Sequence, residues 1–544
     1  MSSFSRGRFT RLVPLVLVAM CLLLVFTLQI SPSSQSAATK SPIEKDTAVN
    51  EDHAADEQRQ KERQRMIDGR RTVIEPVVTP HDEGLDHLSF THDIAVPSPL
   101  PAWTEADMLS LQSLMGQQAL ADLLTVPESM PDFKLLTYQQ RVFKALFQYL
   151  DPIVAAGEVD LEHDPKYKDV WALYQKLENV LYPWLKPYYK NAFHLTNTTE
   201  GRGIVICIGN YHFQYAATAL RAIREVLKSN LPIEVFYIRE SDLSPMRRQY
   251  LETEFDNVKT IAVVDRINDW YTRFGGWSLK SYAILASSFS EVILVDADAY
   301  FFKKPEGLFD DAGYRKTGTL FFYDRTLFSG WEVGRNWLLS FLPSMSSFVE
   351  KTRWWSYRSA HEQESGVVVI NKRRSLFGLL ATCKMNDKRE RDQVTYKHIH
   401  GDKESFWIGY EMMQTPYSFI KSYGAVIGGL GDAGDPTTVC GTQLHLGVDH
   451  QPLWWNGGLL RDKNKWPDRY LTFTHYAEGE DWEFETSCIK NKDRIREFSQ
   501  KERNLALQYV ALDGQRRKDE ALIESGEWKP RSKKTTTMTD NTVA

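Results

Sequence analysis

The chain has 544 residues, 42% of them hydrophobic and 12% aromatic, which is enough for two or three domains with sizeable cores. Its formal net charge is only −5, so nothing in the composition indicates a nucleic-acid-binding protein or a strongly charged partner. The P-loop patterns GxxxxGKS and GxxxxGKT are absent. Their absence argues against a P-loop NTPase.

The first 101 residues are predicted to attach the protein to a membrane and to hold the remainder away from it. Residues 1–11 carry three arginines and no acid, and residues 12–30 form an apolar run long enough to cross a bilayer. Arginines on the N-terminal side favour a cytoplasmic tail and a lumenal remainder, which is a type II anchor. A cleaved signal peptide ending near Ala38 is the alternative. Residues 31–101, which are polar and rich in charge, predict a disordered stem.

Residues 102–200 have the composition of a helical subdomain. Asp132 is a suitable N-cap for one helix, and a second helical pattern runs from about residue 166 to residue 182 and stops before Pro183. Nothing in this part indicates chemistry. Asn197 begins the only N-glycosylation sequon, at a position that we expect to be an exposed linker.

Strand and helix patterns alternate between residues 201 and 476, which we predict to be an α/β domain. The predicted helices cover residues 212–228 and 278–289, and the predicted strands cover residues 204–208, 233–238, 258–264, 292–295, 317–323 and 366–370. Such alternation is typical of a mostly parallel, Rossmann-like sheet flanked by helices. Regular structure is expected to fade after about Tyr476, with a helical extension at 477–530 and a disordered tail at 531–544.

The stretch from Glu291 to Asp298 organises the prediction of function. Four apolar residues, 292–295, are followed by two aspartates, Asp296 and Asp298, one residue apart. In an α/β sheet, ligands bind outside the carboxyl ends of the strands. Two carboxylates at that place repel each other unless a cation lies between them. Hard divalent cations prefer oxygen ligands and can bridge a diphosphate, so the aspartate pair is a candidate metal site. The structural alternative is that both aspartates cap the next turn.

Five cysteines occur, and none has the spacing of a zinc site. Cys21 lies in the apolar N-terminal run, and Cys207 lies inside a predicted buried strand, where we expect it to be free. In an oxidising compartment, Cys440 is expected to pair with Cys488 or with Cys383.

Five ordered blocks in roughly the middle half of the chain resemble the fungal Golgi α-1,3-mannosyltransferase family, which has the GT-A glycosyltransferase fold. The blocks are GGWSLKSYA from Gly275, the strand that ends at Asp298, EQESG from Glu362, GDKESFW from Gly401 and PLWWNGG from Pro452. The predicted anchor and stem are also similar to that family's architecture. The resemblance implies a GT-A-type domain in the Golgi lumen, held by one N-terminal membrane helix.

The resemblance also implies a donor and a metal site. The donor would be GDP-mannose, and the metal would be Mn²⁺ with Mg²⁺ as the alternative. Asp298 would ligate the metal, and Asp296 would contact the ribose or help to hold the metal. Related retaining enzymes supply a third ligand from a histidine seven residues before a Pro-Trp pair. His445 stands seven residues before Pro452, although the tryptophan comes one place later, and His450 is the competing candidate. Imidazole is an acceptable ligand of such a metal.

Further candidates follow from their positions beside predicted strands. Lys280, on the helix before the central strand, would contact donor phosphates or pair with an acid. Gly209, Asn210 and Tyr211 follow the first strand of the domain and would approach the base or the ribose of the donor. A solvated lysine and an ordinary strand-to-helix turn are the structural alternatives.

Glu364 and Asp402 are candidate sugar contacts, because carboxylates recognise hydroxyl groups. By position alone, Asp402 could equally be a helix N-cap. Tryptophans are candidates for an acceptor platform, although we expect at least two of them to pack internally. These tryptophans are Trp354, Trp355, Trp454 and Trp455.

These features predict a metal-dependent retaining transferase that moves mannose from GDP-mannose to a mannose-terminated glycan on proteins. Retention could proceed by double displacement, with Glu364 or Asp402 as nucleophile, or by a front-face route that needs no protein nucleophile. The alternatives are an α-1,2-mannosyl or N-acetylglucosaminyl transferase of the same fold, a metal-dependent hydrolase, and a non-catalytic subunit of a glycan-assembly complex. No nucleic-acid partner is expected.

Overall fold

The computed structural model describes residues 88–431, 434–483, 487–490 and 492–530. The predicted cytoplasmic tail (1–11), membrane anchor (12–30), C-terminal tail (531–544) and most of the predicted stem lie outside the described residues. Among the helices that the structure does describe, none is both long and apolar enough to span a membrane. The last part of the predicted stem is not disordered, because His92–Ala95 forms strand β1 and pairs with strand β9, Tyr417–Ile420.

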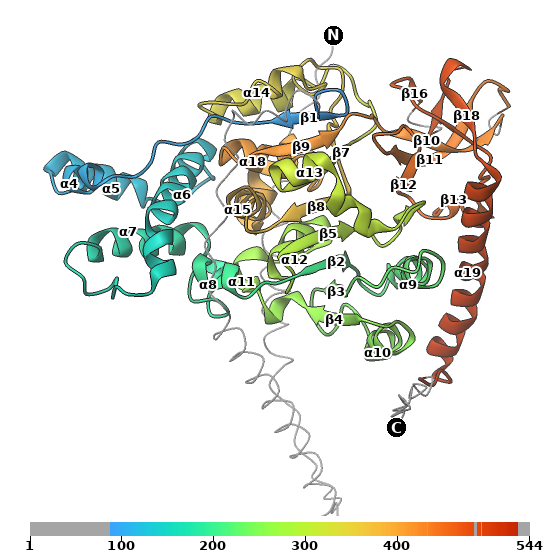
Figure 1. The fold of residues 1–544 in the computed structure, drawn as a ribbon, viewed down its shortest axis with the longest axis horizontal. Coiled ribbons are helices and arrows are strands. Elements are labelled where there is room, and N and C mark those ends of the chain that lie inside the picture. The colour runs from blue at the N-terminus through green and yellow to red at the C-terminus, as the bar shows by residue number, and fades with distance from the viewer. Residues whose placement is uncertain (1–87, 432–433, 484–486, 491, 531–544) are drawn as a thin grey trace, which may run out of the picture. The chain divides into compact units, whose positions relative to one another are not determined.

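A mixed eight-stranded sheet forms the centre of the described part (Figure 1). Its strand order is β1-β9-β7-β8-β5-β2-β3-β4. The other strands are β2 (Arg202–Cys207), β3 (Ile233–Tyr237), β4 (Val258–Ala262), β5 (Glu291–Val295), β7 (Thr319–Tyr323) and β8 (Gln363–Asn371). All six strands predicted from the sequence are therefore present. Six of the eight strands run in one direction, which agrees with the expected mostly parallel sheet, whereas β8 runs antiparallel to both of its neighbours and β1 runs antiparallel to β9.

Helices cover both faces of the sheet, because alternate strand residues point to opposite sides. In β5, Leu294 packs in one core with α12 (Leu279–Ala286), whereas Ile293 packs in the other with α9 (Phe213–Arg221). These two helices correspond to the helices predicted at 278–289 and 212–228. Burial on both faces explains why the strand sequences are continuously apolar rather than alternating.

The predicted helical subdomain is confirmed by two helices. Helix α6 (Phe133–Ala156) begins at Asp132, whose side chain accepts hydrogen bonds from two backbone N–H groups of the first turn. Helix α7 (Lys168–Leu181) ends just before Pro183. Both helices contribute to the same core as α12, so this region supports one face of the central sheet.

A second sheet, entirely antiparallel, follows the first, and the sequence did not reveal it. Its strands are β6 (Tyr300–Phe301), β10 (Ala425–Leu430), β11 (Val439–Leu446), β12 (Pro452–Trp455), β15 (His475–Ala477), β16 (Trp482–Glu483), β17 (Cys488–Ile489) and β18 (Ile495–Glu497). A separate hairpin consists of β13 (Leu460–Asp462) and β14 (Trp466–Tyr470). The expectation that regular structure fades after Tyr476 was wrong, because short strands carry little periodicity to detect.

Two features tie the end of the chain to the rest. A disulfide joins Cys440 to Cys488 across β11 and β17, which confirms one of the two predicted pairings, and Cys383 is buried and free. Helix α19 (Gln500–Ser525) begins with a capping box at Ser499 and occupies the second half of the predicted helical extension at 477–530, whereas β16, β17 and β18 occupy the first half. Figure 1 shows this helix running beside α9 at the edge of the described part.

Candidate functional site

A cavity of about 640 Å³ lies at the carboxyl ends of β2, β3 and β5. Its lining includes Gly209 after β2, Ile238 after β3 and Asp296 after β5. This is the edge at which α/β sheets bind ligands. Seven of the nine predicted site residues line the cavity, namely Gly209, Tyr211, Lys280, Asp296, Asp298, Glu364 and Asp402.

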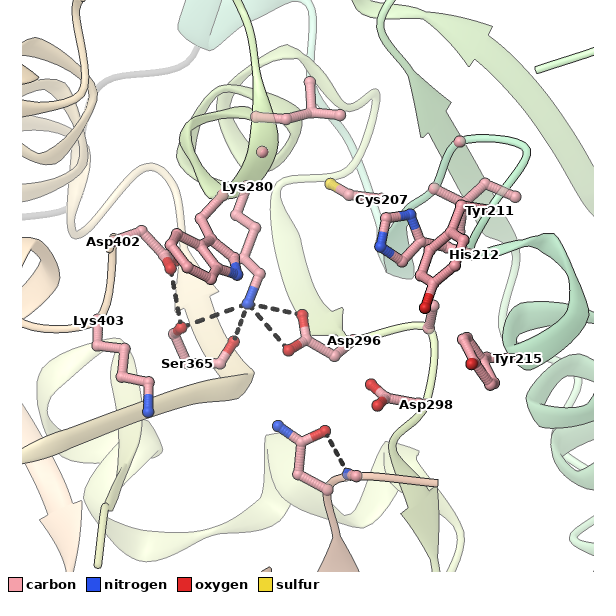
Figure 2. A pocket seen from close by; sticks show the side chains of 18 of the residues that line it. Cys207, Tyr211, His212, Tyr215, Lys280, Asp296, Asp298, Ser365, Asp402 and Lys403 are labelled. Carbon is pink, nitrogen blue, oxygen red and sulfur yellow. Dashed lines mark hydrogen bonds and ion pairs between the residues drawn. The ribbon is translucent and has the colours of Figure 1, made fainter. Parts of the chain in front are cut away.

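Lys280 and Asp296 form a buried ion pair in the cavity lining (Figure 2). The Lys280 Nζ lies 2.7 Å from Asp296 Oδ1 and also donates to the carbonyl and hydroxyl oxygens of Ser365, each 3.3 Å away. Burial acts to lower the pKa of Lys280, but the charges of Asp296 and Asp402 outweigh it and hold the pKa above its usual value. Lys280 is therefore a charged, buried residue rather than a solvated lysine of a helix surface.

Asp298 pairs with Lys463, which lies at the turn between β13 and β14. The Lys463 Nζ forms an ion pair with Asp298 Oδ2 and lies 4.9 Å from the centre of the Tyr215 ring. Burial lowers the pKa of Lys463 to about 8, an effect that the charge of Asp296 opposes. Each of the two aspartates is thus neutralised by its own lysine, as Coulomb repulsion between them requires.

Asp402 lies beside Ser365 with one oxygen unsatisfied. The Ser365 hydroxyl donates to Asp402 Oδ1 over 3.3 Å, whereas the buried Oδ2 has no hydrogen-bond partner. Burial raises the pKa of Asp402 to about 6, against the opposing effect of Lys280. Helix α18 (Ser405–Met412) has no side-chain N-cap bond, so Asp402 does not serve as the helix cap that was its structural alternative.

Glu364 is held on both oxygens. Its Oε1 accepts from the Gly366 N–H over 2.8 Å and from Asn456 Nδ2 over 2.9 Å, and its Oε2 accepts from Lys403 Nζ over 3.3 Å. Burial acts to raise the pKa of Glu364, but the charge of Lys403 outweighs it and the pKa is lowered. Lys403 also donates to the buried Asp324 over 2.6 Å. Glu364 is therefore an ionised carboxylate within a satisfied polar network.

The predicted donor loop after β2 only partly faces the cavity. A Cβ atom on Gly209 would lie 2.5 Å from Asp242 Oδ1, so only glycine fits there, and Asp242 also lines the cavity. Tyr211 lines the cavity with 63% of its surface exposed. Asn210 does not line it. The Asn210 side chain instead accepts from the Ser244 N–H, which makes its role structural.

His445 is not brought to the two aspartates. It is 2% exposed, its ring stacks on Trp454 at 3.9 Å between centroids, and it does not line the cavity. Its Nε2 is buried without a hydrogen-bond partner, and burial lowers its pKa to about 4. His450 is exposed and lies near Glu478. Within the described ranges, no group of three or more His, Cys, Asp and Glu side chains could hold a metal ion.

The predicted tryptophan platform does not form. Trp354, Trp454 and Trp455 are at most 1% exposed and belong to hydrophobic cores, and Trp355 packs under the guanidinium of Arg335. The tryptophan in the cavity lining is Trp277, which is 50% exposed. It had appeared in the sequence only as part of the GGWSLKSYA block.

Several lining residues were not predicted as site residues. Lys403 and Asn456 stand inside blocks that carried the family resemblance, so closer attention to the polar residues of those blocks would have found them. Other lining residues carry no recognisable local signal, because distant segments bring them to the cavity. These are His212, Tyr215, Asp242, Arg325, His400, Thr442, Gln443 and Lys463.

Comparison with known proteins finds mannosyltransferases that are similar to this chain. A family model described as "Mannosyltransferase putative" matches residues 201–331 and 343–446, which include all nine predicted site residues. "Putative alpha-1,3-mannosyltransferase MNN1" of Candida albicans is 26% identical over 70% of this chain and 52% of its own length. "Alpha-1,3-mannosyltransferase MNN1" of Saccharomyces cerevisiae is 22% identical over 62% of this chain and 50% of its own length. The chain thus spans about half the length of these curated relatives.

Solved structures give only weak overlaps. The mannosyltransferase Ktr4p from S. cerevisiae matches with a TM-score of 0.29 and 10% identity, over 56% of this chain and 82% of that chain. Core-mannan synthase A from Aspergillus fumigatus, in a Mn/GDP form, matches with a TM-score of 0.28 and 11% identity, over 39% and 70%. TM-scores of this size do not establish a common fold.

Proposed function

Because this chain matches a mannosyltransferase family model and is related to fungal α-1,3-mannosyltransferases, as the sequence predicted, we propose that it is a retaining glycosyltransferase with a GT-A-type domain. It transfers mannose from GDP-mannose to a hydroxyl group of a mannose-terminated glycan and forms an α-1,3 linkage. The apolar run at residues 12–30, with three arginines before it, anchors the chain in the Golgi membrane and leaves the catalytic domain in the lumen.

One observation carries the proposal. Asp296, Asp298, Lys280 and Lys463 converge on a single cavity at the carboxyl edge of the sheet, inside or beside the segments that match the family. Carboxylates and lysines together suit a nucleoside diphosphate, because lysines pair with phosphate oxygens and carboxylates hold a counter-ion. A cavity of about 640 Å³ also falls in the range of small-molecule sites.

The residues present fit a divalent cation held by carboxylates. Hard cations of this kind are often bound by one or two carboxylates together with the phosphate oxygens of a substrate. Asp298 would be the direct ligand and Asp296 the supporting one, whereas His445, stacked on Trp454, contributes nothing in this geometry. When bound, the metal would carry part of the negative charge that the departing diphosphate develops. Lys463 has to leave Asp298 Oδ2 for that to happen.

The chain's own cations have separate tasks in this mechanism. Lys280 orients Asp296 and the hydroxyl group of Ser365, and its burial means that it remains in place. Lys463, once separated from Asp298, is a counter-charge for the diphosphate from the turn of the β13–β14 hairpin. Fixed charges in a cavity that excludes much of the solvent stabilise a leaving group more than the same charges in water.

Retention of configuration is proposed to follow the front-face route. Double displacement requires a carboxylate with an accessible oxygen on the far side of the sugar. Glu364 is 3% exposed and accepts hydrogen bonds on both oxygens, and the unpartnered Oδ2 of Asp402 is itself buried. Neither presents an open nucleophile. In the front-face route the acceptor hydroxyl bonds to the anomeric carbon as the diphosphate leaves, and its proton passes to the diphosphate.

The test is a donor screen with the purified full-length chain. Common nucleotide sugars are offered with an α-mannoside acceptor, and release of the nucleotide and the linkage of any product are measured. We expect GDP release from GDP-mannose that needs Mn²⁺ or Mg²⁺, with an α-1,3-linked product. Turnover of another nucleotide sugar, another linkage, or no turnover of any donor would overturn the proposal.

A further inference from the structure

Four aromatic rings form a continuous strip that leads from the cavity to the surface. Trp277 and His400 both line the cavity, with ring centroids 5.5 Å apart. His361 follows at 5.5 Å from His400, and Phe328 at 5.5 Å from His361. We call these four residues the ring strip. The family resemblance and the predicted mechanism assign no role to them.

The strip exposes much aromatic surface to solvent. Trp277 is 50% exposed and Phe328 is 52% exposed, and His400 is also exposed, whereas His361 is buried beneath them. Scattered exposed aromatics are common. Here Trp277 and His400 expose their rings beside the cavity and Phe328 exposes its ring farther out, with the buried His361 between them, and this arrangement indicates a binding surface.

The backbone around the strip is built to display these rings. Gly401 has φ +68°, and a Cβ atom there would lie 2.8 Å from the Trp277 ring, so the ring packs directly on the peptide backbone. Phe328 has φ +58°, a left-handed conformation that is unfavourable for a bulky residue. The next residues of its loop are held in place, because the Gly330 N–H donates to the Tyr357 carbonyl over 2.7 Å. A strained position that presents an exposed ring is a candidate for function.

The strip lies on the side of the cavity away from the predicted donor loop. Figure 2 shows Asp402 and Lys403 on one side of the Lys280–Asp296 pair, and Tyr211 with His212 on the other. His400 stands two residues before Asp402 in the chain. A nucleotide that approaches Tyr211 would therefore leave the strip uncovered.

We propose that the ring strip binds the acceptor glycan, at sugar units beyond the one that receives mannose. A pyranose ring has an apolar face of C–H groups that stacks on aromatic rings, and its hydroxyl groups stand at the edge. Arg325, which lines the same cavity, is available for hydroxyl groups at the inner end of the strip. The inference rests on the proposed function and adds the acceptor class, a linear mannoside of several units.

The test compares acceptors of different length. Phe328→Asn removes the outermost ring and keeps the backbone, because asparagine tolerates positive φ. We expect the KM for mannotriose, relative to the KM for methyl α-mannoside, to rise by about 5- to 10-fold, since a tenfold change corresponds to about 1.4 kcal/mol, the upper range for one aromatic contact. Phe328→Tyr, which keeps a ring, should restore the wild-type ratio.

Tyr138→Ala is the matched control, because Tyr138 is an exposed aromatic (57%) on helix α6, outside the cavity lining. It should leave both KM values unchanged. An unchanged KM ratio in Phe328→Asn, or a rise in the KM for GDP-mannose instead, would overturn the proposal. Saturation-transfer NMR can measure mannotriose binding to the wild type and to Phe328→Asn, and this measurement of the strip does not require turnover. If the wild type turns over no donor but binds mannotriose, and Phe328→Asn does not bind it, the strip is supported and only the proposed function is contradicted.

Discussion

The cavity is lined by two sets of side chains that come from different kinds of sequence. The first set belongs to the central sheet, where Lys280, Asp296 and Asp298 lie within 19 residues of one another in the chain. The second set comes from the antiparallel part, where Gln443 lies on β11 and Lys463 at the turn of a hairpin. The first set follows a pattern that the sequence displays, and the second is assembled only by the fold.

The two sets also differ in how firmly they are held. Asp296 is held on both oxygens by a buried lysine that also donates to two oxygens of Ser365, so it belongs to a rigid part of the structure. Lys463 is fixed chiefly by Asp298, and its hairpin rests on α19 through Arg517, which donates to Asp468 and to the Pro467 carbonyl. The sheet edge therefore supplies charges that stay in place, whereas the hairpin supplies the charge of Lys463, which can be displaced from Asp298.

The largest expected effect tests the sheet edge. Asp298→Asn should lower transfer by about 100- to 1,000-fold, because it removes the carboxylate that would hold the metal beneath the departing diphosphate. The measurement is the initial rate of GDP-mannose turnover at saturating Mn²⁺. Asp449→Asn is the control, since Asp449 is a half-exposed aspartate paired with Lys303 away from the cavity lining. Full activity of Asp298→Asn would show that Asp298 does not bind a metal during transfer.

Asp402→Asn should separate stability from catalysis. Burial raises the pKa of Asp402 to about 6, so the unfolded chain releases this proton at lower pH than the folded protein does. The wild type therefore loses stability as pH rises from about 4 to about 6, and it does not regain that stability at neutral pH. The asparagine variant escapes this loss and should be more stable at pH 7.5 by about 1–3 kcal/mol.

The measurement for Asp402→Asn is the free energy of unfolding of both proteins at several values of pH. The extra stability of Asp402→Asn should shrink toward pH 4 and vanish once the Asp402 carboxyl of the wild type is protonated in both the folded and the unfolded state. Transfer by the variant should fall by no more than about 10-fold if Asp402 only supports Ser365 and Lys280. A loss beyond about 10,000-fold would instead identify Asp402 as a nucleophile and contradict the front-face route.

The smallest expected effect sharpens the contrast between the fixed and the displaceable charge. Lys463→Ala removes the ammonium group that competes with a metal for Asp298. The affinity for Mn²⁺ without nucleotide, measured by calorimetry, should rise by about 3- to 10-fold, in line with an ion pair worth on the order of 1 kcal/mol. Lys465→Ala, on the same turn but exposed, is the control. Equal affinities in the wild type and Lys463→Ala would show that Lys463 does not compete.

Prediction from the sequence succeeded where a residue's place depends on its own element. Asp296 and Asp298 follow a strand that is unmistakable, and Lys280 stands on the helix that leads into it, so their approach to one cavity could be inferred. His445 was selected by its spacing to Pro452, and its metal-binding role stays a prediction, but its ring does not line the cavity. A shift in register between His445 and Leu446 and the stacking on Trp454 decide where that ring lies, and neither is visible in spacing.

The tryptophans illustrate the same limit. The sequence could not say which of the four candidate tryptophans pack internally, and Trp454 and Trp455 are both fully buried in hydrophobic cores beside the central sheet and α19. Trp277 is exposed because the turn that carries it lies over Gly401, more than 120 residues later in the chain. Exposure of a large side chain depends on what packs against it, and distant segments supply that packing.

By itself, the sequence determined the α/β pattern, the carboxylate pair after a buried strand and the resemblance to a family, because these depend on short stretches whose chemistry is local. Only the tertiary structure decided that the sheet is mixed, that each aspartate has its own lysine, and that Trp277 rather than Trp454 faces the cavity. The physical reason is that ion pairing and burial are properties of pairs of segments. Their partners here come from β8, the β13–β14 hairpin and the turn before α18, far from the residues that they position.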